Sequence, residues 1–296
     1  MVGQFAENSA RWRVMAGVVC ISFSPIFVAL ADVAPTTSAF YRVAIGGGAL
    51  LLLLLALRRK PGFSLAVYGG LLFTGVWFTA DLWFWHSSIR DGGPGLSTLL
   101  ASLQVCFVTL IGWLVLRERV KLRQLIAIPL ALFGLVLIVG IDWNALPTDY
   151  RRGVIFGVLT GLSYALYLLT LRRVQAATRS SIPLAEIAIM SLVSAVFLAG
   201  IAGGEGESLA VTGTAAIGWL IAYGVLAHVL GWLLIASGIA QVSPAVFGLS
   251  LLAQPVLTYI WDILIFGRSI GLIEFVGGAI TLAAVFIGGA ARPDPA

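Results

Sequence analysis

Residues 87–114, SSIRDGGPGLSTLLASLQVCFVTLIGWL, decide the fold, because residues 237–264, SGIAQVSPAVFGLSLLAQPVLTYIWDIL, repeat their pattern 150 positions later without a gap. Apolar matches are common in so hydrophobic a chain, but proline and glutamine are uncommon inside apolar spans, so matches between them indicate a duplication. The shared positions include Ser87/Ser237, Ile89/Ile239, Pro94/Pro244, Leu99/Leu249, Gln104/Gln254 and Leu114/Leu264. A shift of 140 residues aligns the start of each copy, where Arg11, Val14, Gly17 and Val18 match Arg151, Val154, Gly157 and Val158.

The rest of the chain consists of further segments of the same kind. About 20 mostly apolar residues form a helix that crosses the hydrocarbon core of a bilayer. Ten segments meet this requirement, and almost nothing remains for a soluble domain. The predicted spans are Arg13–Ala31, Ser38–Leu57, Ala66–Ser88, Gly93–Leu116, Leu122–Ile141, Gly153–Val174, Pro183–Gly204, Thr214–Gly238, Ser243–Phe266 and Ile270–Ala290. With 60% hydrophobic and 10% charged residues, the sequence predicts an all-helical polytopic membrane protein.

The duplication divides the ten spans into two repeats of five, residues 1–146 and 147–296. An odd number of spans per repeat forces the two repeats into opposite orientations in the membrane. Inverted repeats around a site at the membrane midplane are the recurring architecture of alternating-access transporters. We therefore expect a substrate cavity between the repeats, lined by the third and eighth spans with help from the first, fourth, sixth and ninth.

The formal net charge of +5 comes from basic residues in short breaks, a distribution that sets membrane orientation rather than binding to nucleic acid. With a cytoplasmic N-terminus, 13 basic residues face inward and 4 face outward, so both termini are expected in the cytoplasm. The inward residues are Arg11, Arg13, Arg58, Arg59, Lys60, Arg117, Arg119, Lys121, Arg123, Arg172, Arg173, Arg179 and Arg292, and the outward ones are Arg90, Arg151, Arg152 and Arg268. The first apolar run lacks a small-residue cleavage site, and we interpret it as the first span.

Chemistry-bearing motifs are sparse, so we expect no catalytic residues, no cofactor and no metal. Cys20 and Cys106 each lie inside a predicted span, where a free thiol behaves as a small hydrophobic group. The sequence has neither an H-E-x-x-H pair nor a P-loop, which disfavours a membrane enzyme. Lys60 and Lys121 both lie in breaks, which leaves no buried amine for a retinal-type Schiff base. A channel remains an alternative to a carrier.

Several motifs occur in an arrangement found in a known family. They are Arg42 after Pro35, Gly92-Gly93-Pro94, Leu116-Arg117-Glu118 followed by Gln124, and the run from Gly153 to Arg173 that contains Ser163-Tyr164-Ala165-Leu166-Tyr167. With the ten-span layout, they resemble the drug/metabolite transporter superfamily and its bacterial EamA-type exporters. The aromatic-rich third span is similar to the aromatic amino-acid exporter branch known as YddG. The second repeat departs from the pattern, because Gly267-Arg268 stands opposite Arg117-Glu118.

The resemblance implies a carrier in the bacterial inner membrane that exports small organic solutes, most notably amino acids including aromatic ones. It implies a lipid bilayer and small-molecule substrates as partners, no nucleic acid, and a monomer or weak homodimer. A carrier of the same superfamily for another metabolite or a drug-like cation remains an alternative.

Ionisable residues inside spans cost free energy and usually face a cavity or a partner. Asp81 lies on one helical face with Trp77 and Trp85, at the four-residue spacing that stacks side chains. We interpret Asp81 and Trp77 as substrate-binding. The alternative is an outer-leaflet acid that pairs with Arg90 or a serine, with the tryptophans in an interfacial belt.

His228 lies deep in the eighth span, one turn before Trp232, and the 150-residue shift aligns it with Phe78. We place His228, Trp232 and Phe78 in the predicted substrate site. The alternative for His228 is a hydrogen bond between helices. His86, near the outer end of its span, is a weaker candidate.

Tyr164 and Tyr167, which align with Ser24 and Phe27 of the first span, offer flat apolar faces and single hydroxyls to an amphipathic solute. Gln104 and Gln254 occupy equivalent places near mid-span, where paired amides suit either a zwitterion or contact between the repeats. All four are predicted substrate-binding residues, and packing is the alternative.

The remaining charged groups are assigned by depth. For Arg42, three roles remain open: a contact to an anion, an anchor that snorkels to the membrane surface, and a partner for Asp81. Glu186, Asp262 and Glu274 lie near span ends, where we expect them to reach the headgroup region. Asp81 and His228 are then the deep titratable groups, and we expect transport to be facilitative or only weakly proton-linked. Glycine pairs such as Gly153, Gly157 and Gly161 are interpreted as helix-packing surfaces.

Overall fold

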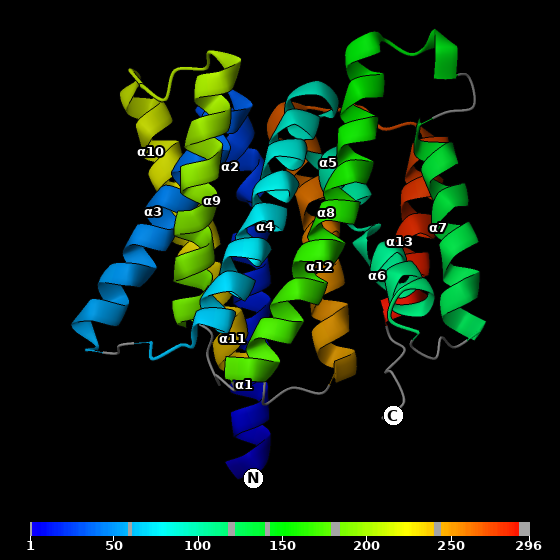
Figure 1. Ribbon diagram of the computed structural model, residues 1–296. Coiled ribbons are helices and arrows are strands. Elements are labelled where there is room, and N and C mark those ends of the chain that lie inside the picture. Colours follow the sequence, from blue (N-terminus) through cyan, green and yellow to red (C-terminus); the bar gives the residue numbers. More distant parts are fainter. Residues whose placement is uncertain are drawn as a thin grey trace.

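The computed structural model describes residues 2–58, 61–117, 122–139, 143–178, 184–239 and 244–289 (Figure 1). Every regular element in these ranges is a helix, which confirms the predicted fold class. The elements are α1 Val2–Ser22, α2 Ser24–Ala31, α3 Pro35–Ala56, α4 Leu65–Gly92, α5 Pro94–Ala101, α6 Gln104–Leu114, α7 Leu122–Val139, η1 Trp143–Ala145, α8 Thr148–Thr178, α9 Leu184–Glu205, α10 Thr214–Ala222, η2 Tyr223–Gly231, α11 Trp232–Ile239, α12 Pro244–Phe266 and α13 Leu272–Gly289.

These helices form the ten predicted spans. Within the described ranges, eight segments are long and apolar enough to cross a membrane, and the apolar helices Ala253–Phe266 and Leu272–Ile287 are shorter. The eight are Ser9–Ala31, Pro35–Ala56, Leu65–Gly92, Pro94–Leu114, Leu122–Val139, Thr148–Thr178, Leu184–Glu205 and Thr214–Ile235. The predicted ends at Ile141, Pro183, Ser243 and Ala290 lie outside the described residues, as do Arg59, Lys60, Arg119, Lys121, Arg179 and Arg292.

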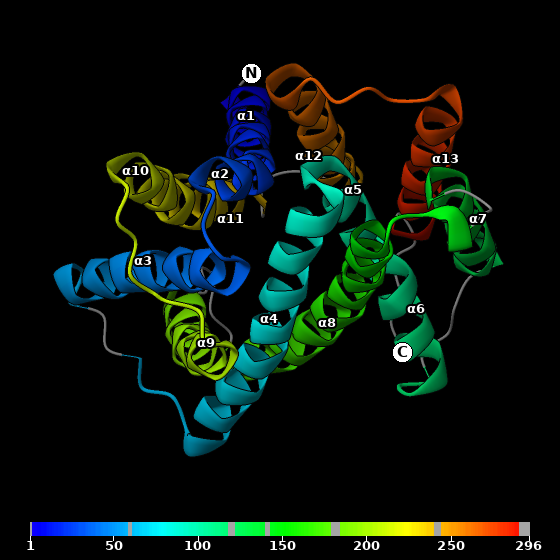
Figure 2. The same cartoon turned by 90° about the horizontal axis from the view of Figure 1, so that it is seen from above.

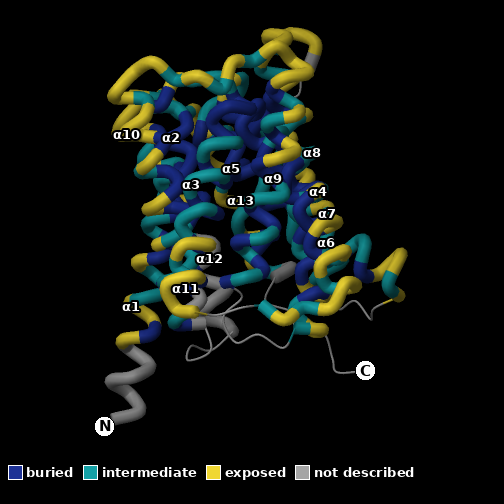
Figure 3. The backbone as a smooth tube through the Cα atoms, turned by 60° about the vertical axis from the view of Figure 1, so that its left-hand side comes forward, coloured by how far each residue is buried: buried dark blue, intermediate teal, exposed yellow. Residues whose placement is uncertain are grey.

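The spans run up and down between two ends of the bundle. We call the end where α1 begins and α13 finishes the base, and the opposite end the apex (Figure 1). The turns that join α2 to α3, α4 to α5, α9 to α10 and α12 to α13 all lie at the apex. Large apolar side chains such as Leu52, Val196 and Phe275 are exposed, as expected of a surface that contacts lipid. Figure 3 shows how exposed and buried residues are distributed along the backbone.

The packing of the spans follows the predicted two-fold relation between inverted repeats. The third span, α4, packs along the sixth span, α8. The eighth span is the counterpart of the third, and the first span is the counterpart of the sixth. These two also pack together, through α11 and α1. The second span α3 lies against its own counterpart α9, and the fifth span α7 lies against its counterpart α13 (Figure 2). The molecule is therefore built from two inverted five-helix repeats.

Three spans are irregular, which the sequence analysis did not predict. The first span is interrupted at Phe23, where Pro25 starts α2 without a backbone N–H to donate. The carbonyl of Ser22 at this break accepts a hydrogen bond from Thr258 Oγ1 at 2.9 Å. The fourth span is interrupted between α5 and α6, and the eighth contains the π-helix η2 between α10 and α11.

The turn between α4 and α5 is the predicted break and restart at Gly92-Gly93-Pro94. Gly93 has a φ of 86°, a conformation that costs side-chain-bearing residues free energy but suits glycine. Pro94 then opens α5, where a missing N–H is harmless. The N–H of Gly95 donates to Asp262 Oδ2 at 3.0 Å, so α12 of the second repeat caps α5 of the first.

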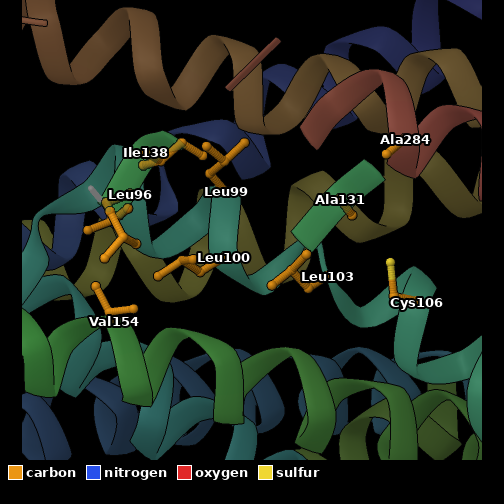
Figure 4. Close-up of a cluster of buried hydrophobic side chains, with 10 residues drawn as sticks. Leu96, Leu99, Leu100, Leu103, Cys106, Ala131, Ile138, Val154 and Ala284 are labelled. Atoms are coloured by element: carbon orange, nitrogen blue, oxygen red, sulfur yellow. The ribbon is translucent and has the colours of Figure 1, made fainter. Parts of the chain in front are cut away.

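A buried apolar cluster joins the two repeats beside this turn (Figure 4). It contains Leu96, Leu99, Leu100, Leu103, Cys106, Ala131, Ile138, Val139, Val154 and Ala284. Cys106 is a free thiol inside the cluster, as expected of a small hydrophobic residue.

The glycines of α8 act as the predicted packing surface. A Cβ on Gly157 would lie 2.5 Å from Leu100 Cδ1, and one on Gly153 would lie 2.9 Å from the backbone nitrogen of Gly92. Both positions therefore require glycine for the close approach of α8 to the α4–α5 turn.

Candidate functional site

Four aromatic rings form a continuous column between the repeats. Tyr164 stacks on Tyr167 with ring centroids 5.3 Å apart, and Tyr167 stacks on Phe78 at 5.0 Å. Phe78 in turn stacks on His228 at 6.2 Å. The column joins α8, α4 and η2, and all four residues were predicted from the sequence.

The contact between Phe78 and His228 places the column at the centre of the molecule. These residues occupy equivalent positions in the two repeats, 150 positions apart. Equivalent positions of two repeats meet only close to the pseudo-two-fold axis that relates them. The aromatic column therefore lies at the axis, where a site shared by both repeats is expected.

Arg42 on α3 is buried beside this column, with 9% of its surface exposed. Its Nη1 donates to the hydroxyl of Tyr223 at 2.9 Å, and its Nε lies 3.4 Å from Nδ1 of His228. The guanidinium also lies over the rings of Trp85 and Tyr223, at 5.6 and 5.1 Å. These partners are all uncharged, and no carboxylate in the described part of the chain forms an ion pair with Arg42. The guanidinium is thus buried without a carboxylate in direct contact among the described residues.

Two hydrogen-bonded chains hold Arg42 in place. Tyr223 donates to Nε2 of His86 at 3.1 Å, and Nδ1 of His86 donates to the carbonyl of Leu82 at 2.7 Å. On the other side, Nε2 of His228 lies 2.9 Å from the hydroxyl of Ser191 on α9. Because Nδ1 of His228 accepts from Arg42, its ring proton belongs on Nε2, and the imidazole is neutral.

Asp81 is buried on α4 and interacts electrostatically with Arg42, but the two do not form an ion pair within 4 Å. Its carboxylate makes no hydrogen bond to any residue that the structure describes. The alternative of a pair with Arg90 is wrong, because Arg90 instead contacts Asp91 at 3.1 Å. The site therefore contains a buried cation and a buried carboxylate near each other, neither neutralised by a direct partner.

Other predicted site residues lie outside this cluster. Trp232 packs against a cluster that contains the α1 side chains Val14, Val18 and Ile21. Trp77 is half-buried beside the column and meets Phe73 edge-on. Gln104 lies at the break between α5 and α6, where its buried Oε1 has no hydrogen-bond partner, and Gln254 is half-buried in α12.

Tyr223 and Ser191 were missed by the sequence analysis. Tyr223 and His228 are five residues apart, which in an α-helix at 3.6 residues per turn places them on different faces. The π-helix η2, with its i→i+5 hydrogen bonds, brings both onto the side that faces Arg42. The sequence has no periodic pattern of polar residues that predicts this π-helix.

The acidic groups near the span ends make contacts that the sequence analysis did not predict. Asp262 and Glu274 were expected to reach the headgroups, but both contact Arg268 at the apex, at 3.3 and 2.6 Å. Burial opposes the charged form of Arg268, yet Tyr259, Glu274 and Asp262 raise its pKa above the ordinary value. Glu186, in the first turn of α9, has a fully buried side chain, which the sequence analysis did not predict.

Comparison with known proteins agrees with this architecture. The profile of the EamA-like transporter family matches residues 11–140 and again residues 151–288. An uncharacterized transporter of Archaeoglobus fulgidus is 29% identical over 175 residues, which cover 57% of this chain and 58% of that protein. A solved crystal structure with 16% identity matches 95% of this chain and 98% of its own at a TM-score of 0.65, which shows a shared fold. Because the family profile matches both repeats and nearly the whole chain, this protein belongs to the EamA-like transporter family.

Proposed function

We propose that this transporter exports amino acids, including aromatic ones, by alternating access through a site centred on Arg42, Asp81 and the aromatic column. The observation that carries this proposal is the buried Arg42, which contacts only uncharged groups. A buried charge without a directly paired counterion is costly, and a substrate carboxylate that binds here supplies such a partner.

The other features complement the rest of an amino acid. Asp81, which has no hydrogen-bond partner among the described residues, suits the ammonium group. Phe78, Tyr164 and Tyr167 offer ring faces on which an aromatic or large apolar side chain stacks favourably. A zwitterion thus offers a partner to both buried groups at once.

The alternatives are a carrier for a drug-like cation or another metabolite, a channel, and a membrane enzyme. Asp81 and the aromatic rings by themselves suit an organic cation. Arg42 speaks against it, because two like charges at short range in a poorly solvated site repel strongly. Membership of a transporter family speaks against an enzyme, and a channel is distinguished by flux far above carrier rates.

Uptake of labelled tryptophan into proteoliposomes tests the proposal. Indole-3-propionate lacks the ammonium group and tryptamine lacks the carboxylate, so each leaves either Asp81 or Arg42 without a partner. We expect unlabelled tryptophan to compete at least about tenfold better than either analogue, since each lost charge pair is worth more than 1.4 kcal/mol. Competition by tryptamine equal to that of tryptophan would favour a cation carrier.

We place both termini in the cytoplasm and the protein in a bacterial inner membrane. The support is the charge at the two ends. The helix ends at the base (Figure 1) include the start of α1 and α7 and the finish of α3, α6 and α8. In or beside these helix ends the sequence has Arg11, Arg13, Arg58, Arg117, Arg123, Arg172 and Arg173. At the apex, Arg90, Arg152 and Arg268 are all paired with carboxylates. A periplasmic phosphatase fused to the C-terminus should be inactive, and an active fusion would contradict this orientation.

A further inference from the structure

Polar contacts fasten the two repeats to each other at the apex. At the end of α9, the carboxylate of Glu205 accepts from Thr36 Oγ1 at 2.8 Å and from Trp83 Nε1 at 3.0 Å. Just after this helix, the carbonyl of Ser208 accepts from Thr37 Oγ1 at 3.0 Å. In each contact the acceptor belongs to the second repeat and the donor to the first. The end of α9 therefore holds the start of α3 and the apical half of α4.

A second set of contacts holds the turn between α4 and α5. Asp91, next to this turn, accepts from Nε and Nη2 of Arg152 on α8, at 2.6 and 3.0 Å. Ser88 Oγ donates to the carbonyl of Gly153 at 2.8 Å. On the other side of the turn, the N–H of Gly95 donates to Asp262, as described above. Helices α8 and α12 of the second repeat thus hold the turn between them.

The ion pair between Asp91 and Arg152 has the properties of a contact that can open and close. The side chain of Asp91 is 3% exposed, so its charge depends on the two-point contact with the guanidinium. The side chain of Arg152 is 44% exposed and keeps part of its hydration, which limits the strength of the pair. When the repeats separate, water can replace the hydrogen bonds of both groups. An apolar contact at this place would gain nothing from water.

The same two helices carry the candidate site. Phe78 on α4 stacks on Tyr167 of α8, and Asp91 and Arg152 join these helices at their apical ends. Because the column lies between the repeats, a substrate can reach it from the apex only where the repeats part. We propose that four of these contacts form the apex-side gate of the transporter, closed in this conformation. We call them the apex clasp, which consists of Thr36–Glu205, Trp83–Glu205, Asp91–Arg152 and Gly95–Asp262.

The clasp is not duplicated by the inverted repeat. The shifts that align the two copies place Gln241 opposite Asp91, Trp12 opposite Arg152, and Gly112 opposite Asp262. These residues provide neither the ion pair nor the carboxylate that caps α5. The equivalent positions at the base therefore cannot form the same contacts, and we expect changes to the clasp to act on the apex side alone.

Thiol labelling from each side of the membrane tests the gate. The reporter is Phe78→Cys in a chain whose Cys20 and Cys106 are replaced by serine, and the probe is an impermeant polar thiol reagent. We expect Asp91→Asn and Arg152→Gln each to raise the ratio of apex-side to base-side labelling rates by about threefold or more, since less energy is needed to open the apex. A ratio within about 1.5-fold of the parent in both variants would overturn the proposal, as would equal increases in both rates, which indicate general loosening.

Two further variants sharpen the test. Asp149→Asn is the matched control, because Asp149 also contacts Arg152, at 3.1 Å, but lies on the same helix and is 74% exposed. It should leave the ratio unchanged, and an effect as large as that of Asp91→Asn would contradict a gate between the repeats. The double variant of Asp91→Asn and Arg152→Gln should have about the effect of one single variant, because both remove the same contact. Effects that multiply would show that the two residues act independently and would overturn the pair as a latch.

This inference rests on the proposed pathway through the axis, so a second measurement is independent of the reporter at Phe78. Spin labels at Asp32→Cys and Thr148→Cys, both exposed at the apex and in different repeats, report the separation of the repeats directly (Figure 1). We expect Arg152→Gln to increase the population of long distances. If Phe78→Cys of the parent reacted from neither side, the central pathway would be contradicted, and the spin-label distances would still decide the clasp. Identical distance distributions in parent and variant would overturn it.

Discussion

At the scale of single residues, the proposed site depends on how Arg42 is held. It is buried, it is fixed by Tyr223 and His228, and two aromatic rings lie against its guanidinium. The neutral partners fix the direction of the cation without cancelling its charge. Such preorganisation lowers the conformational cost of binding an anionic group.

Replacement of Arg42 should therefore change selectivity as well as affinity. We expect Arg42→Gln to raise the half-saturating concentration of tryptophan by about tenfold or more, because a charge-assisted contact is lost. Tryptamine, which has no carboxylate, should bind the variant better than it binds the parent, since the repulsive charge is gone. Competition assays in proteoliposomes measure both effects, and a parallel loss for both ligands would contradict the assigned role.

Gly46 on α3 makes the space for His228. A Cβ at Gly46 would lie 2.3 Å from His228 Cδ2, whereas one at Gly48 on the same helix would meet nothing within 4 Å. We expect Gly46→Ala to displace His228, to destabilise the protein by about 1–3 kcal/mol through overpacking, and to weaken substrate binding. Gly48→Ala should be neutral or slightly stabilising, because alanine favours the helix. Thermal unfolding in detergent compares the two, and equal melting temperatures would contradict the packing.

At the scale of elements, the regular helices were predictable and the irregular ones were not. Apolar length and the 150-residue register identify the spans and the restart at Gly93, because both depend on local composition. The break at Phe23, by contrast, depends on Thr258, and η2 has no periodic signature of its own. The sequence therefore predicted Phe78, Tyr164, Tyr167 and His228, but it missed Tyr223, and it left the role of Arg42 open.

The capping of α5 by Asp262 is a contact between elements of different repeats. Asp262 accepts from the N–H of Gly95 and pairs with Arg268, and its side chain is buried. We expect Asp262→Ala to destabilise the protein by about 1–3 kcal/mol, because a buried N–H and the half-buried guanidinium of Arg268 both lose a partner. Asp149→Ala removes an exposed carboxylate of a surface pair and should cost less than about 1 kcal/mol. Melting temperatures of the two variants give the comparison.

At the scale of the whole molecule, alternating access requires that the site at the pseudo-two-fold axis be open to one side of the membrane and then to the other. Phe78 lies at the axis and is buried in this conformation, with 5% exposure. In a background with Cys20 and Cys106 replaced by serine, Phe78→Cys should react with an impermeant polar thiol reagent in both right-side-out and inside-out vesicles. Conformational exchange must then open the site to the base and to the apex in turn. Tryptophan should slow the reaction from both sides, because it fills the same site.

Leu52→Cys supplies the control for this measurement, since Leu52 is exposed on the lipid-facing side of α3 and should stay unreactive toward a polar reagent. Reaction of Phe78→Cys from one side only would contradict alternating access through the axis. Equal reaction of Leu52→Cys would show that the bundle opens toward lipid, and the central site would then be wrongly placed. Labelling of Phe78→Cys from both sides, with protection by tryptophan, would support a single transport pathway that runs between the inverted repeats, along the aromatic column and past Arg42.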